Sequence, residues 1–235
     1  MFSIRIAELN IGIDNIYEYA ERFCKRYIID KDSVLDFTVS VTEKDIDAEI
    51  AVSEIEVSRG YAETICIYRA ICDKVLREYN GMLLHSAVIE YEGRGYAFSA
   101  KSGTGKSTHI ALWKKAFGES VRIVNGDKPI IRRIGGKLYA FGTPWCGKEG
   151  FGENTSVALS AICFIERAAE NKITPMSAES AVSMVFSQIL FPSDLEEFDK
   201  TASFLDAMLK EVPCYLLSCN MHVDAAITAY NGMNR

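Results

Sequence analysis

The residues whose types and spacing could bind a phosphate form one segment, Ala100-Lys101-Ser102-Gly103-Thr104-Gly105-Lys106-Ser107-Thr108. An apolar run precedes it and an amphipathic run follows it, which predicts the strand, loop and helix of a phosphate-binding loop. Gly103 and Gly105 allow a sharp turn and a close approach of backbone amides to an anion. Lys106 can reach the outer phosphates, and the Ser107 hydroxyl can ligate Mg²⁺. We therefore predict that residues 101–108 bind a nucleotide.

One position departs from the usual pattern of such loops, which has glycine where this chain has Ala100. Alanine has the smallest side chain that could replace glycine, so we expect the loop to be intact. The alternative is a chance Gly/Ser turn before a helix. The Gly-Lys-Ser-Thr run in the correct context favours the phosphate loop.

A second candidate for chemistry follows the apolar run Val121 to Val124, where Asn125-Gly126-Asp127 ends the predicted strand. A carboxylate at the carboxyl end of a buried strand, beside a phosphate loop, is well placed to hold the Mg²⁺ of a nucleotide. The alternative is a surface turn. We predict that Ser107 and Asp127 serve the metal.

A glycine-rich segment, residues 142–154, joins two predicted strands and contains an exposed-looking tryptophan, Trp145. Such loops commonly line sites, because a rigid scaffold fixes their position. Lys148 could meet a phosphate or a carboxylate. Cys146 has no local base partner that would make it a nucleophile. The alternative is a structured connection without ligand contact.

The segments before this core predict a small α+β subdomain over residues 1–80. Alternation indicates strands over 2–9 and 34–41, and apolar spacing indicates helices over about 16–27 and 63–79. Residues 42–58 fit either a helix or a strand. Asn80-Gly81 ends the second helix without a linker, so we expect this subdomain to pack on a core of residues 81–235.

The core segments predict an α/β fold with a mixed sheet. Strands are expected over 82–91, 96–99, 121–127, 129–134, 137–141, 156–166 and 213–217, and helices follow the loop and cover 177–190, 195–210 and 223–230. In the helix 195–210 we expect Phe198, Ala202, Leu205 and Leu209 to face inward. The turn at residues 92–95 joins two strands directly before the loop, which indicates a hairpin where a simple doubly wound fold would have a crossover helix.

Composition bounds the class of protein. The chain of 235 residues is 49% hydrophobic and 25% charged, as in ordinary globular proteins. The net charge of −6 argues against broad nucleic-acid or membrane binding. The longest apolar runs are strand-sized, no secretory signal is visible, and the seven cysteines fit reduced thiols. We expect a cytoplasmic protein without a zinc site.

Three segments in this order resemble the HPr kinase/phosphorylase family: His85-x-Ala87-Val88, the loop, and Arg122-Ile123-Val124-x-x-Asp127. The nucleotide core of that family is similar to that of phosphoenolpyruvate carboxykinases. The resemblance covers about residues 82–134. It implies a core of that type and Mg²⁺-dependent transfer of phosphate from ATP to a seryl hydroxyl. It places Lys106 on the β- and γ-phosphates, Ser107 and Asp127 at the metal, and His85 beside the transferred group.

This chain departs from the family at two places. The family usually has two consecutive acidic residues where this chain has Gly126-Asp127, and residues 143–153 do not reproduce the usual signature after the core. A single acid must then both bind metal and act as base, or the base lies elsewhere. The candidates are Glu149, Glu153 and His85.

The sequence thus predicts an ATP-binding, HPr-kinase-like protein that phosphorylates a hydroxyl, such as a serine of a small protein or peptide. The predicted catalytic residues are Asp127, His85, Lys106 and Lys148, with Lys148 orienting the acceptor. The alternatives are a regulatory nucleotide-binding module with little turnover and a kinase for a small metabolite. Residues 1–80 would form an acceptor-docking surface if the protein is a kinase for a protein or peptide, and a homodimerisation surface if it is a regulatory module.

Overall fold

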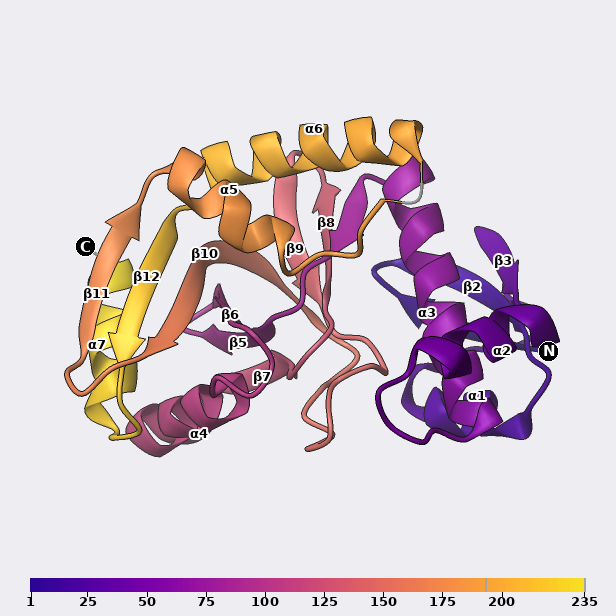
Figure 1. Cartoon of the computed structure of the whole chain (residues 1–235), viewed down its shortest axis with the longest axis horizontal. Helices are drawn as coiled ribbons and strands as arrows, with labels where there is room; N and C mark the ends of the chain where they lie inside the picture. The colour runs from indigo at the N-terminus through magenta and orange to yellow at the C-terminus, as the bar shows by residue number, and fades with distance from the viewer. Residues whose placement is uncertain (193, 235) are drawn as a thin grey trace.

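A computed structural model of the chain describes residues 1–192 and 194–234 and contains two β-sheets (Figure 1). The smaller sheet consists of β1 (Phe2–Ile6), β2 (Leu9–Asp14) and β3 (Phe37–Ser40) in that order. The predicted strand over residues 2–9 is in fact the start of a hairpin. Ala7 and Glu8 both have positive φ, of 51° and 59°, and form the turn between β1 and β2.

The helices of this N-terminal part are α1 (Glu18–Phe23), α2 (Glu43–Val52) and α3 (Arg59–Glu78), with a 3₁₀ turn over Lys25–Tyr27. The ambiguous segment is helical in α2, because the side chains of Thr42 and Asp45 each accept a hydrogen bond from the other's backbone amide and cap the first turn. In α3, Ile67, Ile71 and Val75 are buried as the apolar spacing predicts.

The larger sheet has nine strands and is mixed. Its strands are β4 (Gly81–Leu83), β5 (Ala87–Tyr91), β6 (Arg94–Ser99), β7 (Arg122–Asn125), β8 (Ile130–Ile134), β9 (Lys137–Phe141), β10 (Ser156–Arg167), β11 (Lys172–Met176) and β12 (Cys214–Cys219). The long strand β10 joins two halves, because its start pairs antiparallel with β9 and its remainder pairs parallel with β6 and β12. Sequence analysis missed β11.

The strand directions bring several carboxyl ends to one edge of this sheet. The strands β5 and β6 form the predicted antiparallel hairpin, and β5 is also antiparallel to β7. The strands β6, β7, β10 and β12 therefore run in the same direction. Because loops after parallel strands gather at one edge, the segments that follow these four strands lie together.

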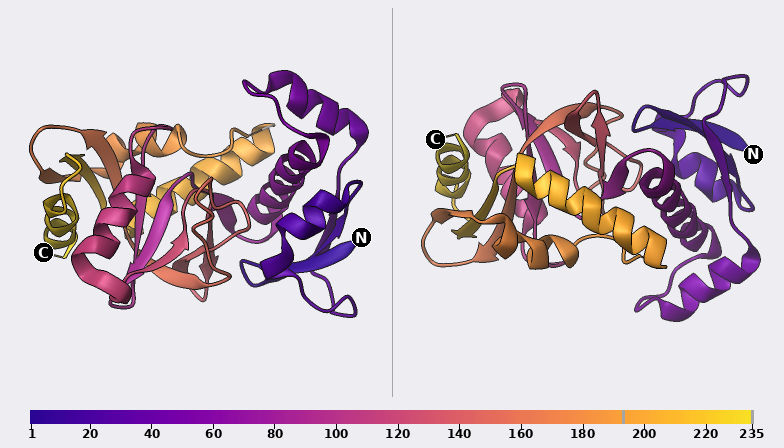
Figure 2. Two further views of the ribbon diagram at one scale, coloured as in Figure 1. Left: turned by 90° about the horizontal axis from the view of Figure 1, so that it is seen from below. Right: turned by 90° about the horizontal axis from the view of Figure 1, so that it is seen from above.

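Helices cover both faces of the larger sheet (Figure 2). The helices α4 (Lys106–Phe117) and α7 (Asp224–Met233) pack on one face, and α5 (Ala178–Phe186) and α6 (Leu195–Glu211) on the other. A 3₁₀ turn over Gly118–Ser120 follows α4. Neighbouring residues of one strand serve the two faces: Ala97 packs toward α5 and α6, whereas Phe98 packs toward α4. The mixed α/β architecture predicted from the sequence is confirmed.

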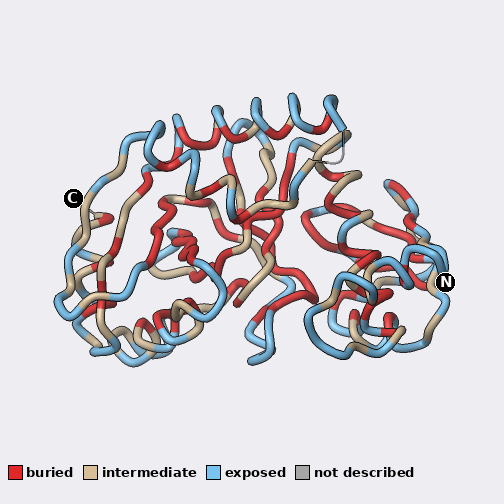
Figure 3. Tube along the Cα trace, in the orientation of Figure 1, coloured by how far each residue is buried: buried red, intermediate tan, exposed pale blue. Residues whose placement is uncertain are grey.

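The N-terminal part shares an apolar cluster with the larger sheet, and buried residues run through both (Figure 3). The prediction that Trp145 is exposed is wrong, because only 5% of this residue is accessible. Its ring stacks on Tyr68 with centroids 4.4 Å apart, and its Nε1 donates to the carbonyl of Thr64. Trp145 therefore joins the loop 142–154 to α3. The boundary between residues 80 and 81 stays a prediction.

No helix in the described ranges combines the length and the apolar character that crossing a membrane requires. All seven cysteines are buried and free, as expected of small apolar side chains. Burial raises the pKa of the Cys146 thiol, which disfavours the thiolate that a nucleophile requires.

Candidate functional site

The segment 100–105, called the glycine loop below, connects β6 to α4. Gly103 and Gly105 have positive φ of 74° and 131°, and a Cβ added at either would meet nothing within 4 Å. Glycine is therefore required there by backbone conformation and not by space. Helix α4 begins at Lys106, directly after Gly105, so its free N-terminal amides and positive dipole end face the same region.

Alanine at position 100 is compatible with this loop. Ala100 does not adopt the positive φ that would call for glycine. Its carbonyl accepts a hydrogen bond from Lys106 Nζ at 3.1 Å. The departure from the usual loop pattern thus leaves the backbone path and the lysine position in place.

Three predicted catalytic side chains meet beside the loop. His85 Nε2 lies 2.9 Å from Asp127 Oδ1 and 3.0 Å from Lys106 Nζ. A single ring nitrogen cannot donate to the carboxylate and accept from the ammonium at once. The lysine therefore competes with the aspartate for His85, and an anion in front of Lys106 would relieve that competition.

The backbone around Asp127 is held by a buried amide. Asn125 Oδ1 accepts from the amides of Asp127 and Lys128, both at 2.8 Å. Its Nδ2 donates to the carbonyl and hydroxyl of Thr143, both at 3.1 Å. Asn125 is fully buried, so this turn is part of the core and is not a flexible surface turn.

His85 is fixed from three sides although it lies between β4 and β5. Its amide donates to the carbonyl of Gln188 at 2.7 Å, and its carbonyl accepts from the Ser99 hydroxyl at 2.9 Å. The amide of Ser86 donates to the carbonyl of Asp127 at 3.0 Å. The hairpin entry to the glycine loop thus places His85 against the turn after β7.

The charges of the cluster follow from burial and from mutual contacts. Burial lowers the pKa of the Lys106 ammonium, and the nearby Asp127 carboxylate only partly offsets this. Burial also raises the pKa of Asp127, but its hydrogen bond with His85 and the neighbouring cations outweigh that effect and leave the pKa below its ordinary value. Asp127 is therefore ionised at neutral pH.

A central cavity of about 430 Å³ collects most of the predicted site residues. It is lined by His85, Ser102, Gly103, Gly105, Lys106, Ser107, Thr108, Gly126, Asp127, Gly147, Lys148 and Glu149. Lys101 and Thr104, which we predicted to bind nucleotide, line flanking cavities instead. Of the alternative bases, Glu149 lines the central cavity and Glu153 does not.

Position 126, directly before Asp127, has no room for a side chain. A Cβ on Gly126 would lie 2.7 Å from the carbonyl oxygen of Cys146 and 3.1 Å from that of Phe151. The amide of Gly126 also donates to the Phe151 carbonyl at 2.7 Å. The loop 142–154 therefore crosses directly over Gly126 and occupies the space that a second carboxylate would need.

That loop is fixed at its base and projects at its tip. Its ends are held by hydrogen bonds from Lys128 N to the Trp145 carbonyl and from Glu153 N to the Val124 carbonyl. The tip, residues 147–150, is exposed, and Lys148 and Glu149 line the central cavity from it. The tip of the loop thus lies beside the glycine loop and Asp127, and its role in binding stays a prediction.

Sequence analysis missed two residues beside the glycine loop. Arg167, at the end of β10, donates to the carbonyls of Gly103 and Thr104 at 2.5 and 3.0 Å and so clamps the loop. His109, one turn into α4, is almost fully buried. Neither belongs to a recognisable motif, because their proximity to the loop depends on strand order and helix rotation.

Oxygen donors for a cation are present but few. Ser107 and Asp127 line the same cavity, whereas no cluster of three or more His, Cys, Asp or Glu side chains able to hold a metal occurs among residues 1–192 and 194–234. Mg²⁺ prefers oxygen ligands, retains several waters and commonly takes further ligands from phosphates. The donor set fits a nucleotide-borne Mg²⁺ better than a protein-held metal.

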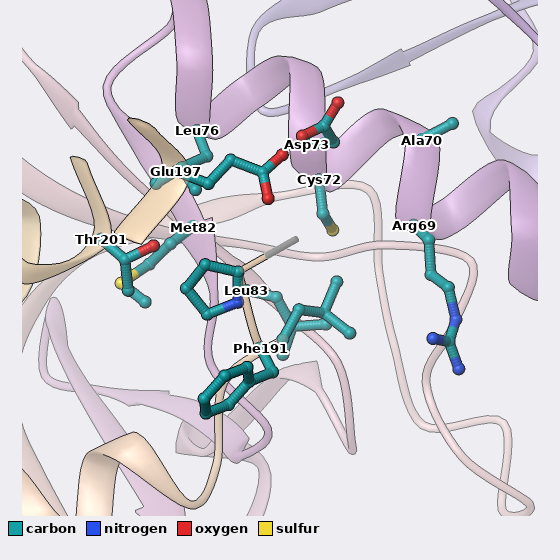
Figure 4. Close-up of a pocket in the computed structure, with 12 residues that line it drawn as sticks. Arg69, Ala70, Cys72, Asp73, Leu76, Met82, Leu83, Phe191, Glu197 and Thr201 are labelled. Atoms are coloured by element: carbon teal, nitrogen blue, oxygen red, sulfur yellow. The ribbon is translucent and has the colours of Figure 1, made fainter. Parts of the chain in front are cut away.

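A further cavity of about 400 Å³ lies between α3 and α6, away from the glycine loop (Figure 4). Met82 and Leu83 of β4 contribute to its wall, and Asp73 and Glu197 bring carboxylates to it. Arg77 bonds to both acids, with Nε 2.9 Å from Asp73 and Nη2 2.6 Å from Glu197. The pair with Glu197 ties α3 to α6, and the pair with Asp73 lies within α3.

Comparison with known proteins identifies the family. A family model described as SynChlorMet cassette protein ScmC matches residues 62–224. The chain belongs to this family. The match includes the central cavity, most of α3 and the loop 142–154, so these features lie within the part shared by ScmC proteins. A search of curated proteins finds no matching sequence.

Among solved structures, the HPr(Ser) kinase/phosphatase from Coxiella burnetii is similar to this ScmC chain over 64% of this chain and 89% of the other. The sequence identity is 9% and the TM-score is 0.38. This is a partial structural resemblance and does not assign the chain to that protein's family.

Proposed function

We propose that this ScmC protein binds ATP with Mg²⁺ at the glycine loop and transfers the terminal phosphoryl group to a hydroxyl. The observation that supports this most directly is the convergence of Lys106, His85 and Asp127 within 3.0 Å contacts at the wall of one cavity. Phosphoryl transfer requires mainly positioning and charge neutralisation, together with a group that accepts the hydroxyl proton. The cavity offers all three.

The binding roles follow from the lining of the cavity. Lys106 and the amides at the start of α4 would hold the β- and γ-phosphates. The Ser107 hydroxyl and the Asp127 carboxylate would ligate Mg²⁺, which when bound neutralises charge on the phosphates. Gain of a phosphate partner would draw Lys106 away from His85 and leave His85 paired with Asp127.

The transfer step involves this His85–Asp127 pair. The acceptor oxygen forms a bond to the γ-phosphorus as the bond from that phosphorus to the bridging oxygen of ADP breaks. The hydroxyl proton passes to His85 or Asp127, which lie 2.9 Å apart. Because Asp127 has a lowered pKa, His85 is the better base of the two, and the carboxylate stabilises the imidazolium that forms.

The acceptor would enter beside the exposed tip of the loop 142–154, where Lys148 would orient it. We propose a serine of a small protein or peptide as acceptor. The overall acidity of the chain favours neither nucleic acid nor an anionic membrane as partner. Residues 1–80 would supply an acceptor-docking or homodimer surface, and the cytoplasm would be the compartment.

A regulatory module that binds nucleotide without turnover is the second candidate. The observation that favours it is the glycine at position 126, which leaves a single carboxylate at the turn after β7. A kinase for a small metabolite would use the same cavity. These functions differ in what happens to the γ-phosphate and in which acceptor receives it.

The test uses γ-labelled ATP and Mg²⁺ with the purified protein, candidate peptides and small hydroxyl compounds. We expect label transfer, a loss of at least about a hundredfold in Lys106→Ala, and a comparable loss in Asp127→Asn. Lys115→Ala is the matched control, because this exposed lysine of α4 lies outside the central cavity. Tight ATP binding without release or transfer of label under any condition would establish the regulatory alternative.

A further inference from the structure

A second cavity adjoins the glycine loop, and one of its lining residues carries a buried polar atom without a partner. It measures about 510 Å³ and lies between α4 and the ends of β10 and β12. It shares Gly103, Gly105 and Thr108 with the central cavity, so the two adjoin at the start of α4. We call it the β12 cavity.

The polar atom is Nδ1 of His109, a residue that lines the β12 cavity and is only 2% exposed. Trp113 Nε1 can only donate, and it lies 3.1 Å from His109 Nε2, which must therefore accept. Burial lowers the pKa of His109 to about 3, so the ring is neutral. The single ring proton is then on Nδ1, which finds no acceptor among the described residues.

We propose that the β12 cavity holds the base of the bound nucleotide, that this base is adenine, and that His109 Nδ1 donates to one of its ring nitrogens. This proposal rests on the proposed function, because it places the remainder of a nucleotide whose phosphates lie over Lys106. A buried donor without a partner costs free energy, and a base with acceptor nitrogens would satisfy it.

The direction of the nucleotide follows from the shared lining. The terminal phosphate belongs near Lys106, His85 and Asp127, at one end of the central cavity. Thr108, two residues after Lys106, borders both cavities, whereas His85, Lys106 and Asp127 border only the central one. A nucleotide that extends from Lys106 past Thr108 therefore brings its sugar and base into the β12 cavity.

The walls suit a flat apolar ring with few donors. Leu112, Ile165 and Met221 supply apolar surface for the ring faces. Among the described residues that line this cavity there is no Asp or Glu, and Asn220 already accepts from the amide of His222 through Oδ1. Guanine carries ring and amino donors that require such acceptors, whereas adenine carries one amino group. The lining therefore favours adenine.

A rival cavity lies on the other side of the glycine loop, against α5. It measures about 790 Å³ and also contains a buried atom without a partner, Gln188 Oε1. It shares only Ser102 and Gly103 with the central cavity and does not border Thr108. A base there would require the phosphates to leave the start of α4, so we favour the β12 cavity.

The test compares the affinities of ATP, GTP and inorganic tripolyphosphate, each with Mg²⁺, by isothermal titration calorimetry on the full chain. Tripolyphosphate lacks a base, so the ratio of its affinity to that of ATP isolates the contribution of the nucleoside. For the unmodified protein we expect ATP to bind at least roughly tenfold more tightly than tripolyphosphate and than GTP.

Two variants alter the β12 cavity and one alters its rival. Ala168→Phe fills the β12 cavity, and Ser183→Phe makes the same kind of change in the cavity against α5. His109→Gln removes the Nδ1 donor while the glutamine oxygen can still accept from Trp113. We expect Ala168→Phe to abolish and His109→Gln to reduce the advantage of ATP, with tripolyphosphate affinity unchanged, and Ser183→Phe to leave both affinities unchanged.

The outcomes separate the two proposals. If the unmodified protein binds neither ATP nor tripolyphosphate, the proposed function itself is overturned. An advantage of ATP that survives Ala168→Phe and His109→Gln, or that is lost in Ser183→Phe, overturns the base site and leaves phosphate binding intact. Equal affinities for ATP and GTP overturn the assignment of adenine. Thermal unfolding of each variant shows whether a lost affinity reflects a lost fold.

Discussion

Substitution of Gly126 tests whether the loop 142–154 excludes a second acid beside Asp127. An added Cβ would lie 2.7 Å from the Cys146 carbonyl oxygen and 3.1 Å from that of Phe151. Both contacts are with backbone, and the Phe151 carbonyl is already bonded to the Gly126 amide, so relief requires the loop to shift. Overpacking of this kind costs about 1–3 kcal/mol. At about 2–4 °C per kcal/mol for a chain of this length, Gly126→Ala should lower Tm by about 2–12 °C.

The informative comparison is between Gly126→Ala and Gly126→Asp. The aspartate creates a pair of consecutive acids with Asp127 but meets the same backbone atoms through its Cβ. We expect it to be at least as destabilised as the alanine variant and to transfer no more phosphate than the unmodified protein. Differential scanning fluorimetry gives Tm, and label transfer from γ-labelled ATP gives turnover.

Either of two results would refute this explanation of Gly126. If Gly126→Asp keeps the Tm of the unmodified protein and increases phosphoryl transfer, the loop does not occupy the space beside Asp127, and the glycine reflects loss of catalysis and not packing. If Gly126→Ala alone keeps its Tm, the loop accommodates a Cβ and the steric explanation is wrong, whatever the activity.

Three further predictions concern the loop and its supports. Trp145→Phe removes the hydrogen bond from the indole to the Thr64 carbonyl, which keeps only its bond within α3, and should lower the free energy of unfolding in urea by about 0.5–1.5 kcal/mol; an unchanged value contradicts the contact. The affinity for ATP should fall with increasing pH as Lys106 loses its proton. Because the pKa of Lys106 is lowered, this fall should begin at a lower pH than for an ordinary lysine, and Lys106→Arg should remove it. An affinity of the unmodified protein that does not change with pH contradicts this prediction. Arg167→Met should speed hydrogen exchange in the glycine loop, because two carbonyl contacts are lost, and equal exchange rates argue against a clamp.

Features that depend on local chemistry were predictable from the sequence. The hairpin between β5 and β6 follows from the Glu92-Gly93 turn, and the hairpin between β8 and β9 from Gly135-Gly136. The glycine loop lies between a strand and a helix as its motif predicts. In each case the residues that determine the structure are close neighbours in the chain.

Features that depend on long-range packing were not predictable. Trp145 stands in a glycine-rich loop, and nothing near it in the chain indicates that Tyr68 stacks on it. The prediction of which residues of α6 face inward is only partly right. Leu205 and Leu209 are buried, but Phe198 is 43% exposed, because the buried face at that end of the helix is occupied by Glu197, which pairs with Arg77 of α3.

The position of Asp127 depends on the N-terminal part as well as on the sheet. Thr64 and Tyr68 lie one turn apart on α3, and both face the turn that carries the carboxylate. The Thr64 carbonyl holds Trp145, whose own carbonyl accepts from Lys128 N, and the Tyr68 hydroxyl donates to the Lys128 carbonyl at 2.8 Å. Both backbone polar groups of the residue after Asp127 are thus held directly by α3 or by the loop that α3 supports. A boundary at residue 80 divides the chain in sequence, but the geometry of the candidate site requires residues from both sides of it.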